Sequence, residues 1–287
     1  MAKIISMINL KGGVGKTTTI IALAEFLAYE KNQKVLVIDL DPQTNATVAL
    51  IGEDEWVRRN EKGRTLLQLF KDKIDRTNLF DLSKSIVKNA SNIKGGSENL
   101  DLLPSSLGLI EIIDILPSIP AGAFFVSSPV TILKDVITDT LEDYDYVLID
   151  CPPNLGIITL NGILISDYYL IPSIPDILST YGIPQILNRI EGFAKETKIG
   201  IQPLGIIVSM YRAASRLHNA TISELKSKHA MPKNPYPRIF DTVIPLSVRS
   251  AEASDFDAAP NTVKQKYGYG NYFEVYNSLT DELMSYV

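Results

Sequence analysis

The sequence predicts an α/β fold built on a doubly wound, mostly parallel sheet with helices on both faces. Three observations predict it. Short β-rich apolar runs recur along the chain, segments of helical length separate several of them, and a glycine-rich segment follows the first run. Runs that are apolar throughout are typical of parallel strands that are buried on both faces. Right-handed crossovers between such strands place a ligand at their carboxyl ends.

The predicted elements follow from these patterns. Strands are expected where the runs are short and rich in β-branched or aromatic residues, at 3–9, 34–39, 146–150, 168–172 and 203–209. Helices are expected at 17–30 and 181–196, and a last helix is expected within 268–287. The Asn, Ser and Gly content of residues 88–99 predicts a loop.

The chain shows no internal repeat and no long linker, so a single domain spanning 1–287 is the simplest interpretation. The segment 103–133 is apolar and interrupted by prolines, and it either covers the core or forms a partner surface. Burial is the favoured interpretation, because apolar runs are more often core than interface.

The amino-acid composition excludes several classes of protein. Hydrophobic residues make up 45% and charged residues 21%, as in an ordinary globular protein. Cys151 is the only cysteine, which excludes an intrachain disulfide and a multi-cysteine metal site and fits a reducing cytoplasm. We see no export signal and no apolar run of about 20 residues, so we expect a cytoplasmic protein that does not span a membrane.

The charge is distributed unevenly. The whole chain carries −5, but residues 211–249 hold seven Lys or Arg against two acids, a local charge of +5 that leaves −10 elsewhere. A local basic stretch can bind nucleic acid even when the net charge is negative. The final segment, 268–287, has acids and no basic residue, which makes it a poor anchor for an anionic membrane surface.

The strongest motif is a phosphate-binding loop between the first strand and the first helix. It consists of Lys11, Gly12, Gly13, Val14, Gly15, Lys16, Thr17 and Thr18. Glycines let backbone N–H groups turn towards phosphate oxygens, and the helix N-terminus favours an anion. Lys16 is expected to contact the β and γ phosphates, and the Thr17 hydroxyl is expected to reach Mg²⁺. The motif therefore predicts a P-loop NTPase type of fold that binds ATP and Mg²⁺.

The loop departs from the standard P-loop at its start. Leu10 stands where the first glycine is expected, and Lys11 adds a second cation. Within one subunit Lys11 would be redundant, but it could reach phosphates across a dimer. The alternative interpretation, that Lys11 is only a solvated loop lysine, is about as good from the residue alone.

Acidic residues follow two of the predicted strands. Asp39 and Asp41 come at the end of one strand, and Asp150 comes at the end of another. Carboxylates at the ends of parallel strands face the ligand crevice. We expect Asp39 and Asp150 to hold Mg²⁺ or its water shell and Asp41 to orient the attacking water. A helix cap is the alternative for Asp41.

Four segments, NLKGGVGKTTT, VLVIDLDPQTNAT, YDYVLIDCPPNLG and FDTVIPLSVRSAEAS, resemble in order and spacing the ParA/Soj branch of the ParA/MinD deviant Walker A ATPases. The resemblance spans nearly the whole chain. It implies a homodimer that closes on ATP, with Lys11 reaching the partner subunit's phosphates and Asp41 positioning the hydrolytic water. It also implies nonspecific DNA binding on the nucleoid, a cargo adaptor protein that stimulates hydrolysis, and a plasmid, chromosome or protein assembly such as a bacterial microcompartment as cargo.

The resemblance also suggests residues for DNA and adenine. Arg249 matches the family's DNA-binding arginine, and Arg212 and Arg216 are the expected substitutes where Leu246 replaces a further arginine. Adenine is expected near Met210 and Pro245.

Other classes on this fold remain as alternatives. A MinD-like membrane-surface ATPase for division-site placement lacks its basic amphipathic tail here. A reductase with an iron–sulfur cluster between subunits needs two cysteines from each chain, and this chain has one. A metabolic ligase would need a substrate pocket that the sequence does not reveal.

Overall fold

The computed structural model describes residues 1–116, 128–231, 236–247, 256–268 and 271–287. Six strands form one sheet in the order β3-β2-β4-β1-β5-β6, and every strand pairing in it is parallel. The strands are β1 (Lys3–Met7), β2 (Val35–Asp39), β3 (Leu100–Leu103), β4 (Tyr146–Asp150), β5 (Tyr168–Ser173) and β6 (Gln202–Val208). The predicted doubly wound parallel sheet is confirmed.

Helices connect the strands and follow the last one. They are α1 (Lys16–Glu25), α2 (Asn45–Ile51), α3 (Glu53–Glu61), α4 (Leu66–Asp75), α5 (Leu82–Ser85), α6 (Leu109–Ile113), α7 (Lys134–Ile137), α8 (Ile157–Ile165), α9 (Ile177–Tyr181), α10 (Ile183–Thr197), α11 (Arg216–His229), α13 (Val263–Tyr267) and α14 (Asn271–Tyr286). A π-helical turn, η1 (Phe26–Glu30), and two 3₁₀ turns, η3 (Thr138–Asp143) and η4 (Phe256–Ala258), complete the described elements.

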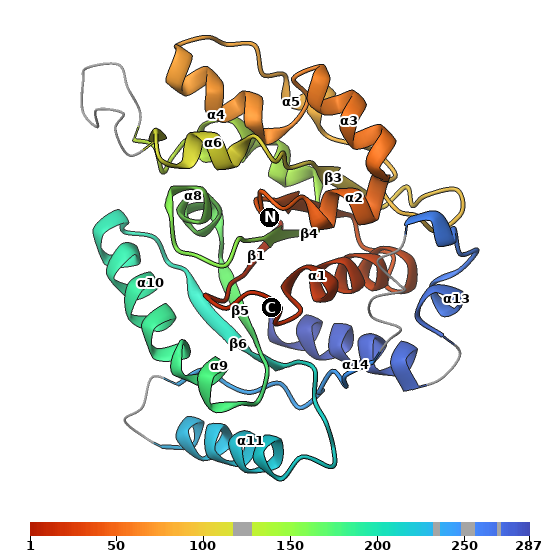
Figure 1. Cartoon of the computed structure of the whole chain (residues 1–287), viewed down its shortest axis with the longest axis vertical. Coiled ribbons are helices and arrows are strands. Elements are labelled where there is room, and N and C mark those ends of the chain that lie inside the picture. Colours follow the sequence, from red (N-terminus) through yellow and green to blue (C-terminus); the bar gives the residue numbers. More distant parts are fainter. Residues whose placement is uncertain (117–127, 232–235, 248–255, 269–270) are drawn as a thin grey trace.

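Alternate residues of each strand enter two separate apolar cores, one on each face of the sheet. From β1, Ile5 and Met7 join the core formed with α1, α2, α13 and α14. Ile4 joins the opposite core, which α4, α6, α8 and α10 cover. Figure 1 shows α1 and α14 on one side of the sheet and α8 and α10 on the other. The predicted helices on both faces are therefore present, and the sheet is buried on both sides as parallel sheets are.

The strand β3 was not predicted. Its four residues come directly after the expected loop at 88–99, and only the last of them, Leu103, falls within the apolar segment 103–133. In the structure Val35 pairs with Leu100 and Ile38 with Leu103, so this short run extends the sheet beside β2. These four residues, LDLL, include Asp101 and are too few to show a periodicity that separates a strand from the start of a helix.

Two predicted helices differ in detail. The helix expected at 17–30 is α1 continued by the π-helical turn η1. The helix expected at 181–196 begins at Ile183, because the chain turns at Gly182 between α9 and α10. The expected C-terminal helix is present as α14.

Where the structure describes it, the apolar segment 103–133 is partly core and partly surface, since Leu107, Ile110 and Ile115 are exposed. Leu109, Ile112, Leu116 and Leu133 are buried against the sheet. Residues 117–127 lie outside the described part of the chain. The favoured interpretation of burial therefore holds for only part of the described segment.

The topology brings the predicted site residues to one edge of the sheet. β1 lies between β4 and β5, and its carboxyl end leads into the glycine-rich loop and α1. Along the register, Met7 pairs with Asp150, and Asp150 pairs with Asp39 on the other side of β4. Three strand ends therefore converge where parallel sheets of this kind bind ligands.

Candidate nucleotide site

The glycine-rich loop forms an open cradle in front of α1. Gly13 and Gly15 have positive φ angles of 70° and 82°, in the left-handed region that glycine adopts without strain. A Cβ on Gly12 or Gly13 would meet no atom within 4 Å, so the space above both residues is open. Val14 is fully buried and anchors the loop from below. This arrangement leaves backbone N–H groups accessible to an anion at the helix N-terminus.

Two residues that the sequence analysis did not single out hold the loop in place. The Asn9 amide donates to the Pro172 carbonyl oxygen (2.7 Å) and accepts from the Lys11 N–H (2.8 Å). Ser209, just after β6, donates its hydroxyl to the Val14 carbonyl oxygen at 2.7 Å. The loop is therefore fixed by hydrogen bonds to the ends of β5 and β6. Ser209 directly follows β6 and Asn9 lies two residues after β1, so a polar residue near the end of each strand was the only sequence signal for either role.

Lys16 lies over its own loop. Its side-chain nitrogen is 3.4 Å from the carbonyl oxygens of both Asn9 and Lys11, and the residue is 6% exposed. Burial lowers the pKa of Lys16, while the nearby carboxylates of Asp150 and Asp41 raise it. The ammonium group therefore lies between two carboxylates and the open cradle, where a phosphate would be a strong counter-ion.

Asp150 has a buried carboxylate without an ordinary partner. The residue is fully buried, and neither oxygen accepts a hydrogen bond of normal geometry from the residues that the structure describes. Burial raises the pKa of Asp150 to about 7, although the adjacent Thr17 hydroxyl and Lys16 lower it and Asp41 raises it. Buried carboxylates without partners are rare and call for a missing ligand.

The donor set fits Mg²⁺ bound together with phosphates. Mg²⁺ keeps several waters and is usually held by one or two carboxylates, a hydroxyl and substrate phosphates. Asp150 and Thr17 offer those protein groups at the foot of the cradle. Within the described ranges no group of three His, Cys, Asp or Glu forms a metal cage by itself. A metal here would therefore depend on phosphate oxygens.

Asp39 has a different hydrogen-bonding environment from Asp150. One of its oxygens accepts from the Asp41 N–H at 3.0 Å, and the other accepts from the N–H and hydroxyl of Thr47 at 2.9 and 2.7 Å. Burial raises the pKa of Asp39, with the Asp150 charge as the next cause. One oxygen is thus bonded to the loop after β2 and the other to Thr47 in α2, so Asp150 is the better placed carboxylate for a metal.

Asp41 lines the phosphate side of the site and is 7% exposed. Its Oδ1 accepts from the Gln43 N–H at 2.9 Å. The next helix, α2, begins at Asn45 with Thr44 at its N-cap position. Asp41 therefore closes a turn before the helix and does not cap it, which removes the helix-cap alternative.

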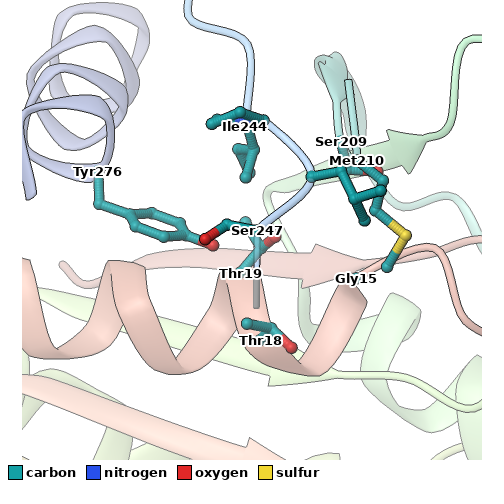
Figure 2. A pocket seen from close by; sticks show the side chains of 10 residues that line it. Gly15, Thr18, Thr19, Ser209, Met210, Ile244, Ser247 and Tyr276 are labelled. Atoms are coloured by element: carbon teal, nitrogen blue, oxygen red, sulfur yellow. The ribbon is translucent and has the colours of Figure 1, made fainter. Parts of the chain in front are cut away.

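Two cavities meet at the loop. One of about 500 Å³ lies over the glycines and is lined by Lys16, Thr17 and Asp41. The other, of about 240 Å³, is lined by Ser209, Met210, Pro245 and Tyr276 (Figure 2). Gly15, Thr18 and Met210 line both cavities. A cavity lined by Lys16, Thr17 and Asp41 beside a more apolar cavity offers the two environments that phosphates and a base require.

The second cavity includes both residues expected near adenine. Met210 has a φ of 50°, uncommon for a non-glycine residue, and its Cε lies 3.9 Å from where a Cβ on Gly15 would stand. Pro245 lies beside Met210 because Tyr211 and Pro245 form a parallel bridge. Tyr276 reaches the same cavity from α14 towards Ser247 (Figure 2). Tyr276 could not be predicted as a site residue from the sequence, because only the tertiary fold brings the last helix to the first loop.

Lys11 is held within its own subunit. Its side-chain nitrogen lies 3.3 Å from Asp176 Oδ2 and donates to the Ser179 hydroxyl at 3.0 Å. Asp176 caps α9 by accepting from the Ser179 N–H at 2.7 Å. The Lys11 side chain is 40% exposed, so this ion pair is partly hydrated and weak. Lys11 is therefore neither a freely solvated lysine nor a ligand of its own phosphate cradle.

The basic stretch 211–249 is only partly free to bind an anion. Lys226 pairs with Asp241 at 3.0 Å, and Lys228 pairs with Glu224 at 2.7 Å. Both acids of the stretch are used in these two pairs. Arg238 lies over the Tyr286 ring, 4.1 Å from its centroid.

The structure describes two of the three expected DNA-binding arginines. Arg212 and Arg216 are exposed and form no ion pair with any residue described by the structure. Arg216 begins α11, and Arg212 lies two residues after Met210. Arg249 lies outside the described residues.

No helix in the described part of the chain is both long enough and apolar enough to cross a bilayer. The last helix, α14, buries Phe273, Tyr276, Leu279 and Leu283 against the core that includes α1. Its apolar face is thus covered by protein.

Comparison with known proteins agrees with this site. The sequence pattern of the AAA domain family (AAA_31) matches residues 2–202. The chain is 32% identical over 254 residues to the sporulation initiation inhibitor protein Soj of Bacillus subtilis (strain 168), covering 88% of each chain. It is 29% identical over 287 residues to the chromosome-partitioning ATPase Soj of Thermus thermophilus, covering 99% of this chain and 96% of that one.

A solved structure shares the same architecture. A variant of Cyanothece McdA in complex with ATP superimposes with a TM-score of 0.75 at 25% identity, covering 99% of this chain and 96% of that chain. The family pattern covers more than half of the present sequence, and the Soj relatives cover nearly all of it. The chain therefore belongs to the AAA domain family, within the ParA/Soj branch of the ParA/MinD deviant Walker A ATPases.

Proposed function

We propose that this chain is an ATPase that binds MgATP, dimerises on ATP, binds DNA nonspecifically as the dimer, and positions or segregates a cargo. The observation that carries the proposal is the pair of joined cavities, one over the glycine loop and one at Met210, with the unpartnered Asp150 carboxylate beneath. We further propose that residues 1–287 act as one ATPase domain, because one sheet holds all six strands and α14 returns to α1.

Within each subunit the chain's own groups would divide the work of binding. The loop N–H groups from Gly12 to Thr18 and the Lys16 ammonium would hold the β and γ phosphates. The Thr17 hydroxyl and Asp150 would hold Mg²⁺ or its waters, with Asp39 fixing the loop beside them. Mg²⁺, when bound, neutralises charge that develops on the phosphate oxygens. Met210 and Pro245 would form one wall of the adenine pocket.

Hydrolysis would depend on Asp41. Its carboxylate lines the phosphate cavity, and the turn closed by Gln43 fixes its orientation. From that position it would orient the attacking water towards the γ phosphate. Lys11 would act across the dimer. Its side chain would part from Asp176 and Ser179 and contact the partner subunit's phosphates.

DNA binding would involve Arg212, Arg216 and Arg249. Arg212 and Arg216 are exposed cations near the base pocket, and phosphate contacts by such cations supply most nonspecific affinity. The protein would then be cytoplasmic and concentrated on the nucleoid in the ATP-bound state. A cargo adaptor protein would stimulate hydrolysis and so release the dimer.

The alternative is a MinD-like membrane-surface ATPase. Two observations oppose it: α14 has no basic residue in its last turn, and its apolar face is packed on the protein core. The cargo could be a plasmid, a chromosome or a microcompartment. A neighbouring gene for a centromere-binding protein would favour the first two, and a shell-protein gene cluster would favour the third.

The test is cosedimentation of the protein with duplex DNA or with anionic liposomes, each with ATP, with ADP and without nucleotide. We expect ATP-dependent binding to DNA that weakens steeply with salt, and no ATP-dependent binding to liposomes. Liposome binding without DNA binding would replace this proposal with the MinD-like alternative.

A further inference from the structure

The short helix α9 presents an apolar surface next to the phosphate loop. Ile177, Leu178 and Tyr181 are 59%, 78% and 73% exposed, so three of the five α9 residues are large apolar side chains in contact with solvent. The α9 sequence contains no charged residue. Single exposed apolar residues are normal, but a contiguous group of this kind marks an interaction site.

Two contacts place this surface beside the proposed dimer face. Asp176, directly before α9, and Ser179 within it both bind the side chain of Lys11. Ser179 is 1% exposed, so α9 rests on the loop through its polar side and directs its apolar side away. The α9 surface is thus continuous with the Lys11 end of the phosphate loop.

The rim of the loop on this side is open. A Cβ at Gly12 or Gly13 would meet no atom within 4 Å, which leaves room for another chain to approach the cradle. An approaching subunit that receives Lys11 must therefore come close to α9. Interface centres are depleted in charge and rich in large apolar and aromatic residues, as α9 is.

We propose that Ile177, Leu178 and Tyr181 form a docking surface for a second copy of this chain in the ATP-bound dimer. This inference rests on the proposed ATP-dependent dimerisation and adds the surface that stabilises it. Because a two-fold dimer uses the same patch on both subunits, each α9 is buried once in the closed dimer. This surface also lies next to Asp176 and Ser179, which bind the Lys11 side chain within the single subunit.

The test compares Leu178→Asp with Leu79→Asp. Both leucines are exposed, 78% and 72%, but Leu79 lies between α4 and α5, at the opposite end of the molecule from α9 (Figure 1). Sedimentation velocity with a nonhydrolysable ATP analogue and Mg²⁺ measures the dimer, and calorimetry measures ATP binding by the monomer. We expect Leu178→Asp to weaken the dimer by at least about tenfold, since a buried leucine is lost, and Leu79→Asp to leave it unchanged.

A second measurement uses Leu178→Cys labelled with an environment-sensitive dye. The natural cysteine, Cys151, is fully buried, so unmodified protein serves as the labelling control. Emission should shift to the blue with the ATP analogue and not with ADP.

The outcomes separate the two levels of inference. A wild-type protein that stays monomeric with the ATP analogue contradicts the proposed function itself. If the wild type dimerises but Leu178→Asp dimerises as tightly as Leu79→Asp, the proposed α9 surface is wrong while the proposed function stands. The same holds if the dye at position 178 stays hydrated in the dimer.

Discussion

Asp39 and Asp150 end neighbouring strands in register, yet only one of the two carboxylates is satisfied. Asp39 accepts one hydrogen bond from Asp41 in the loop after β2 and two from Thr47 in α2, whereas neither oxygen of Asp150 has an ordinary partner among the described residues. The two residues look alike in sequence, since each follows a buried strand. Their environments give Asp39 a structural role and leave Asp150 open to a ligand.

Mg²⁺ binding should depend on pH through Asp150. Burial raises the pKa of this carboxyl to about 7, so below that pH it is largely protonated and cannot hold the ion. We expect the Mg²⁺ affinity of the ATP complex to fall as the pH drops below about 7, by up to about tenfold per pH unit. Asp150→Asn should lower the affinity and flatten its pH dependence. Mg²⁺ titrations at several pH values check this, and an unchanged profile in Asp150→Asn would contradict it.

The stability of the nucleotide-free protein should change in the opposite sense. A carboxyl whose pKa is raised on folding binds more protons when folded, so its contribution to the free energy of unfolding is complete below the unfolded pKa. That contribution is lost as the pH rises from about 4 through about 7. Urea unfolding across this range should show Asp150→Asn losing less stability than the wild type as the pH rises.

Asp41→Ala should separate binding from chemistry. Lys16, Thr17 and the glycines remain, so ATP should still bind, while hydrolysis should fall by roughly 10²-fold or more. Asp41→Asn is the matched control, because its amide oxygen can still accept from the Gln43 N–H and keep the turn. Equal losses in both variants would assign the effect to the charge. Phosphate release and a DNA-release time course after ATP washout measure it; normal hydrolysis in both variants would rule out the water-positioning role.

Lys11→Ala and Asp176→Asn should have opposite effects on the ATP dimer. Lys11→Ala removes the group proposed to cross the interface, so the dimer should be lost while some nucleotide binding remains. Asp176→Asn can still cap α9 but loses the charge that holds Lys11, so the dimer should be as tight or up to about fivefold tighter, because exposed ion pairs are weak. Sedimentation with a nonhydrolysable ATP analogue decides. Equal weakening in both variants would show that Lys11 acts only through Asp176.

Removing Arg212 and Arg216 together should weaken DNA binding without changing ATP affinity. Each neutralised phosphate contributes about 0.9 to the salt slope, so we expect the slope to fall by about 2. The matched control is Lys226→Ala with Lys228→Ala, which removes the same charge from residues already paired with Asp241 and Glu224. Fluorescence anisotropy with duplex DNA at several salt concentrations measures both. An equal loss in the two double variants would assign DNA binding to overall charge.

A buried ion pair should matter most for the stability of the C-terminal part. Lys266 lies 2.7 Å from Glu25, and the two side chains are 1% and 0% exposed. Lys266→Met leaves Glu25 buried without its cation and should cost about 3–5 kcal/mol of the free energy of unfolding. Lys195→Met, which breaks an exposed pair with Glu191, should change it little. Urea unfolding compares the two, and equal costs would contradict the importance of burial.

The sequence by itself determined the parallel α/β fold and the phosphate loop, because both are local patterns. Apolar runs of strand length need no partner to be recognised, and a glycine loop before a helix binds phosphate through its own backbone. The strand β3 could not be predicted in this way, since its four residues, LDLL, include Asp101 and are too few to show a period.

Tertiary structure alone decided which polar groups are satisfied. Ser209 and Tyr276 reach the loop from distant parts of the chain, Asn9 beside the loop bonds to the distant Pro172, and Lys11 bonds to Asp176 across 165 residues. Likewise, only the fold shows that Lys226 and Lys228 form ion pairs, while Arg212 forms none with the residues that the structure describes. Hydrogen bonds and ion pairs depend on distances of a few ångströms between groups that chain topology brings together, and residue order does not encode those distances locally.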